Sequence, residues 1–158
     1  MNNELDIAHL NRLVEALIDS MLSYANAADA VRDDAYKEFF SNRSGERGKG
    51  VAMLQAQVKA LGGVPADEGT LRGSVRRLFL DLPSAWKRGM AAVEEEMERG
   101  ENHIRIMFEA AFNDKQLSPS TLVCLQQVHR LIELGREDLE RLHQADSSTA
   151  PHRDIDTP

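Results

Sequence analysis

The chain is poor in cysteine, because Cys124 is the only one among 158 residues. A single thiol excludes an intrachain disulfide and a zinc site built from several cysteines, and it favours a reducing compartment. The sequence also lacks any apolar run near the ~20 residues that a transmembrane helix needs. Its acidic start, MNNELDIAHL, lacks the basic and then apolar layout of a signal peptide. We therefore expect a cytoplasmic chain with no membrane partner.

Positive charge is in the minority. Nineteen Lys and Arg residues stand against 26 Asp and Glu residues, which gives a formal net charge of −7. A protein that binds nucleic acid by neutralising phosphates needs the opposite sign, so nucleic acid is not an expected partner. Hydrophobic residues make up 42% of the chain, which at this length is enough for one domain with one core.

Alternation of apolar and polar residues, as in a strand, persists nowhere along the chain, and no segment repeats at a period of about 20 to 50 residues. Apolar residues recur instead at helical spacing. This pattern predicts four helices, over about residues 4–31, 33–61, 86–113 and 118–144. Residues 145–158 are small, polar and Pro-containing, and offer too little apolar surface to offset the entropy of ordering them. We expect a bundle over residues 1–144 and a disordered C-terminal tail over 145–158.

The lengths of the connections predict the topology. Only a few residues join the first helix to the second and the third to the fourth, so each pair must be antiparallel. The second and third helices are separated by about residues 62–84, a stretch long enough to travel the length of the bundle. Such a crossover favours parallel second and third helices. The sequence therefore predicts an all-α fold, a ferritin-like four-helix bundle with a long crossover.

A ferritin-like di-metal centre needs a Glu from each of two helices and a Glu-x-x-His from each of the other two, all pointing inward at mid-bundle. The chain meets this requirement only in part. Its one Glu-x-x-His, Glu140 to His143, lies in the last turn of the fourth helix, and Asp19 lies about 180° from the apolar stripe of the first. An atypical ligand set for a di-iron or di-manganese centre remains open. Its members are Glu46, Glu101, His103, His129 and Glu133.

Arginine occupies inward positions where a metal ligand would stand. Arg47 falls on the apolar stripe of the second helix and Arg136 falls inside that of the fourth. Glu96 and Glu101 lie at the edges of the third stripe, and Tyr24 points inward on the first helix. A lone buried Arg is too costly, whereas an Arg paired with a carboxylate is tolerated. We therefore predict a polar core made of Arg47, Arg136, Glu96, Glu101 and Tyr24.

Several short motifs, in order and spacing, resemble a bacterial domain-of-unknown-function family of small ferritin-like helical bundles. They are Ile18-Asp19-Ser20 with Tyr24 and Ala27-Ala28, Arg43-x-x-Glu46-Arg47, Leu61-Gly62-Gly63-x-Pro65 followed by Gly69 and Gly73, and Glu98-Arg99-Gly100-Glu101. The resemblance spans about residues 5–143 and implies the ferritin-like bundle without a reaction. This chain departs from the family with Glu101-Asn102, where a Glu-Asp pair is usual, and with Arg136-Glu137, where a His-Asp pair is usual.

These observations favour a non-catalytic bundle that has no cofactor and acts as an interaction or stress-related protein. A homodimer is expected because apolar residues fall outside the main stripes and could form a second face. These residues are Phe39, Met53, Val123 and Leu131. The alternative is a di-iron or di-manganese carboxylate oxidoreductase with the atypical ligand set, and a small-ligand binding module is a third possibility.

Overall fold

The computed structural model describes residues 3–70 and 82–149, with the side chains of residues 83, 134–137, 139, 140, 143 and 145–149 excepted. These residues form helices and no strand. The helices are α1 (Asn3–Ala30), α2 (Asp34–Ala60), α3 (Leu82–Arg88), α4 (Met90–Phe112) and α5 (Pro119–Thr149). The all-α prediction is therefore confirmed.

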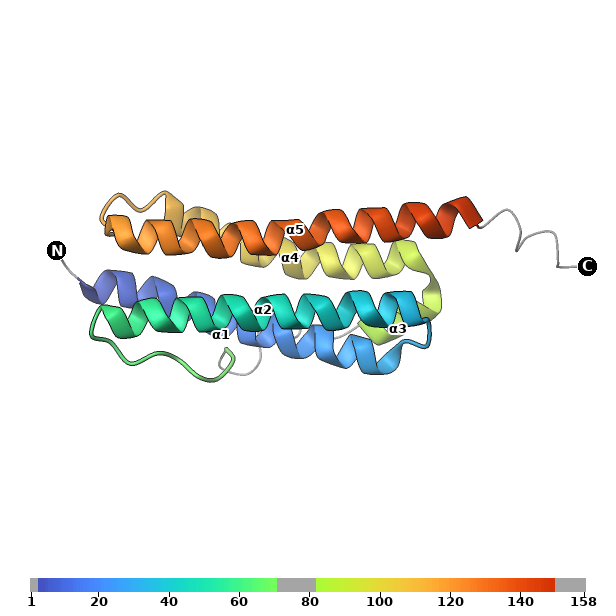
Figure 1. Cartoon of the computed structure of the whole chain (residues 1–158), viewed down its shortest axis with the longest axis horizontal. Coiled ribbons are helices and arrows are strands. Elements are labelled where there is room, and N and C mark those ends of the chain that lie inside the picture. Colours follow the sequence, from blue (N-terminus) through green and yellow to red (C-terminus); the bar gives the residue numbers. More distant parts are fainter. Residues whose placement is uncertain (1–2, 71–81, 150–158) are drawn as a thin grey trace, which may run out of the picture.

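The four long helices pack as a bundle in which α2 and α4 run in the same direction (Figure 1). α1 and α2 are antiparallel neighbours joined by a tight turn, and α4 and α5 form the second antiparallel pair. Because α2 ends at one end of the molecule and α4 begins near the other, the connection between them must cover the length of the bundle. The predicted crossover topology thus agrees with the helix directions.

The core lies between the apolar stripes of these helices. On α1, Leu10, Leu13 and Leu17 are completely or almost completely buried, as the helical spacing requires. A Cβ atom added at Gly50 of α2 would lie 3.3 Å from Leu17 Cδ1 and 3.2 Å from Val128 Cγ1. The glycine therefore allows α1, α2 and α5 to approach closely at mid-bundle.

Capping residues define where α2 begins and where it ends. Asp33 caps the helix because its Oδ1 accepts hydrogen bonds from the backbone N–H groups of Ala35 (2.9 Å) and Tyr36 (3.2 Å). At the other end, Gly62 has φ of 85°, a conformation that L side chains rarely adopt, and the Gly63 N–H donates to the Val58 carbonyl. α2 therefore begins and ends close to its predicted boundaries.

Two predicted boundaries differ from the structure. The third predicted helix is broken at Gly89, whose φ of 113° separates the short α3 from α4, and α3 already begins at Leu82 inside the predicted crossover. The last helix continues to Thr149, five residues into the predicted tail. Residues 145–149 extend α5 although they are small and polar. Adding a residue to an existing helix costs less free energy than nucleating a new one. Residues 150–158 of the tail lie outside the described part of the chain.

Among the helices of the described residues, none combines the length and the apolar content that crossing a membrane requires.

Candidate functional site

Four charged or polar side chains meet at the middle of the bundle. Glu101 of α4 accepts hydrogen bonds at one oxygen, Oε1, from Arg47 Nη2 (2.5 Å), from Arg43 Nη2 (3.2 Å) and from the Tyr24 hydroxyl. The side chains of Arg43 and Arg47 are 2% and 0% exposed, and that of Glu101 is 11% exposed. The structure therefore contains buried Arg–Glu salt bridges, and we call these four residues the ionic cluster.

Helical spacing explains why these residues converge. Arg43 and Arg47 are four residues apart and so lie on the same face of α2, toward the Tyr24 ring of α1. The guanidinium carbons of Arg43 and Arg47 lie 5.5 Å and 5.7 Å from the centre of that ring. The negative face of the ring adds a second favourable contact for two cations that are removed from water.

Arg43 joins all four long helices to the cluster. Its Nη1 donates to Glu46 Oε2 one turn further along α2 (2.9 Å) and to the backbone carbonyl of Ile132 on α5 (3.0 Å). Glu46 is 20% exposed, so the pair lies where the cluster approaches the surface. Two guanidinium groups and two carboxylates balance in charge, which reduces the cost of burying each ion.

The cluster shifts the protonation equilibria of its members. Burial of Glu101 favours its neutral form, but Arg47 and Arg43 outweigh that effect and lower the pKa of the carboxyl group below its ordinary value. Burial, together with the charge of Glu101, raises the pKa of the Tyr24 hydroxyl. Glu101 is therefore an anion and Tyr24 a neutral donor at neutral pH. Neither group has a pKa near 7, which a general acid or base requires.

Some buried donors of the cluster have no hydrogen-bond partner within the described structure. These atoms are Nε and Nη1 of Arg47 and Nε of Arg43, and the buried hydroxyl of Ser20 on α1 is in the same situation. A buried unsatisfied donor costs about 1–3 kcal/mol. The cluster therefore contains more donors than its acceptors satisfy, which is the opposite of a metal site, where lone pairs converge.

The predicted polar core is assembled only in part. The structure brings Tyr24, Arg47 and Glu101 together, but it separates Glu96 from them. Glu96 pairs instead with Arg99 (3.1 Å) and Arg88 (3.8 Å), because it lies on the side of α4 that faces the end of α3. Glu96 therefore does not join the polar core as predicted, and the side chain of Arg136 lies outside the described ones.

Sequence reasoning assigned no core position to Arg43 and named no partner for Asp19. The signal for Arg43 was present, since it lies three residues after Phe40 and four before Arg47, on the same stripe of α2. Asp19, which was expected on the side of α1 opposite the apolar stripe, is 2% exposed because it packs against Gly69 and Thr70 at the start of the crossover. Its Oδ2 accepts a hydrogen bond from the Thr70 N–H (3.1 Å) and another from the Thr70 hydroxyl.

The five candidate metal ligands do not converge. Glu46 and Glu101 both bind Arg43, whereas His103 is exposed on α4. His129 lies 3.6 Å from Glu133 on α5 and packs against aromatic rings of α4. Within the described residues, no group of three or more His, Cys, Asp or Glu side chains is placed to hold a metal ion. The side chains of Glu140 and His143 are outside the described set.

The centre of the bundle does not fit a di-metal group. A metal ion there would lie beside two guanidinium cations that the surrounding low dielectric screens weakly. It would also compete for Glu101, whose Oε1 already accepts hydrogen bonds from three donors, and for Glu46, which is paired with Arg43. The chemistry of the donor set therefore suits a permanent ion-pair network.

A second polar network joins the start of α1 to the start of α5. The buried Asp6 accepts hydrogen bonds at Oδ2 from the N–H (3.2 Å) and hydroxyl (2.5 Å) of Ser118 and from the Thr121 hydroxyl (2.8 Å). One turn along α1, His9 Nε2 lies 3.0 Å from Asp114 Oδ2 in the turn before α5. Asp6 thus places a negative charge at the N-terminus of α5, where the helix dipole favours it.

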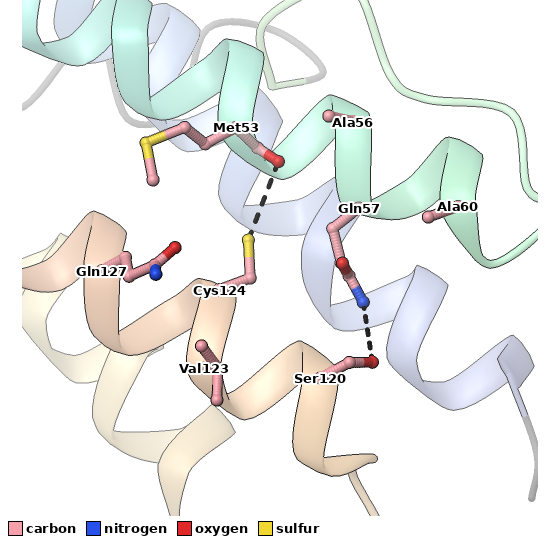
Figure 2. A pocket seen from close by; sticks show the side chains of 8 residues that line it. All are labelled: Met53, Ala56, Gln57, Ala60, Ser120, Val123, Cys124 and Gln127. Atoms are coloured by element: carbon pink, nitrogen blue, oxygen red, sulfur yellow. Dashed lines mark hydrogen bonds between the residues drawn. The ribbon is translucent and has the colours of Figure 1, made fainter.

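The surface between α2 and α5 is hollowed. One hollow, of about 480 Å³, is lined by α2 residues that include Met53 and Ala56 and by α5 residues that include Val123 and Cys124 (Figure 2). Cys124 lies at its floor, where the Sγ atom is 3.7 Å from the Met53 carbonyl oxygen, and burial raises the pKa of the thiol. The thiol is therefore protonated at neutral pH and unsuited to act as a nucleophile.

The fold and the ionic cluster together define an all-α helical bundle held at mid-length by buried ion pairs. The chain belongs to the family described as Domain of unknown function (DUF2383), whose model matches residues 6–114, more than half of the chain. The matched part contains all four residues of the ionic cluster and ends before α5 begins. Comparisons with curated proteins and with solved structures gave no match.

Proposed function

We propose that this protein is a ferritin-like bundle without catalytic metal chemistry, in which the ionic cluster occupies the position that a di-metal centre takes in related folds. It acts in the cytoplasm as an interaction or stress-related protein and associates as a homodimer. The observation that carries the proposal is the placement of two buried guanidinium groups around Glu101.

The electrostatics of the cluster support this function over an oxidoreductase. The Arg side chains neutralise the mid-bundle carboxylates, so these carboxylates attract a divalent cation far less than unpaired ones would. The ion pairs link α2 to α4, the Tyr24 hydroxyl links α1 to the same carboxylate, and Arg43 reaches the Ile132 carbonyl of α5. Such a network stabilises one arrangement of the helices and therefore keeps the outer faces of the bundle in a constant shape.

The metal content of the protein tests this proposal. We expect protein purified without chelator, from cells grown with added iron and manganese, to contain only trace metal per chain. We also expect Fe²⁺ and Mn²⁺ to leave the thermal unfolding midpoint unchanged, since a ligand that binds the folded state raises it. Iron or manganese near one or two equivalents per chain, lost in a Glu101→Gln variant, would establish the oxidoreductase alternative instead.

A further inference from the structure

We draw no further inference here: the strongest candidate, the surface hollow between α2 and α5 around Met53 and Val123, carries none because nothing in the described part of the chain shows what covers it.

Discussion

At the scale of single residues, Glu101 determines whether the centre of the bundle is balanced in charge. One carboxylate oxygen serves two guanidinium groups and a phenol, so the loss of this residue would leave several donors without an acceptor at once. A buried ion pair adds little stability compared with apolar side chains of the same size, yet removing one partner is costly. Glu101 is therefore required mainly because Arg43 and Arg47 are buried beside it.

Replacing Glu101 by Gln should destabilise the protein strongly. The amide keeps the shape of the side chain but removes the charge that compensates the two arginines, and we expect the free energy of unfolding to fall by about 3–5 kcal/mol. Glu98, on the same helix, is 61% exposed and pairs with Arg105, so Glu98→Gln should change it by less than about 1 kcal/mol. Urea unfolding of both variants provides the comparison, and similar losses would contradict this account of the cluster.

Removing only the phenol oxygen should have a smaller effect. In Tyr24→Phe the ring remains beneath both guanidinium groups, and Glu101 keeps both of its arginine partners. A hydrogen bond to a charged group contributes about 1.5–3 kcal/mol, so the loss should lie in that range and below that of Glu101→Gln. Thermal unfolding shows which of the two variants is less stable. A larger loss of stability in Tyr24→Phe than in Glu101→Gln would show that the phenol, and not the charge balance, holds the cluster together.

At the scale of helices, the glycines of α2 show where packing overrides helix propensity. Gly45 has no atom within 4 Å of an added Cβ, whereas a Cβ at Gly50 would press against Leu17 and Val128. We expect Gly45→Ala to raise the free energy of unfolding by about 0.5–1 kcal/mol, because alanine favours the helix. Gly50→Ala should lower it by about 1–3 kcal/mol by overpacking three helices. Urea unfolding at one protein concentration measures whether each variant gains or loses stability. A stabilising Gly50→Ala would show that α1 and α5 can shift to make room for the added methyl group.

The sequence predicted the helices better than the side-chain contacts between them, and the reason is physical. A helical stripe depends on local spacing, so the inward direction of Arg47 and the ends of α2 at Asp33 and Gly62 could be read directly. Whether Glu96 or Glu101 pairs with Arg47 depends on how far α4 is rotated about its axis, and only packing against the other helices determines that rotation. The burial of Asp19 against Gly69 and Thr70 could not be predicted for a similar reason, because the segment that covers it has no strong periodicity of its own.

At the scale of the whole molecule, the crossover explains why the ionic cluster lies at mid-length. Parallel α2 and α4 bring residues near the middle of each helix to the same level, and the antiparallel neighbours α1 and α5 meet them there (Figure 1). Hydrogen bonds at the ends of the bundle, such as that from the Ser118 hydroxyl to Asp6, hold α1 against the start of α5. Burying the ions equally far from both ends keeps them from water and makes the stability of the molecule depend on their charge state.

This dependence predicts how stability changes with pH. The folded protein lowers the pKa of Glu101 below its ordinary value of 4.5, so the folded state favours the carboxylate more than the unfolded state does. The contribution of Glu101 is therefore fully present above about pH 4.5 and is lost as the pH falls below that value through the lowered folded-state pKa. The stability difference between wild type and Glu101→Gln should be constant from about pH 6 to 8 and shrink in acid. Urea unfolding of both proteins across this range measures it, and a difference that stays the same at pH 3 would mean that the charge of Glu101 does not stabilise the fold.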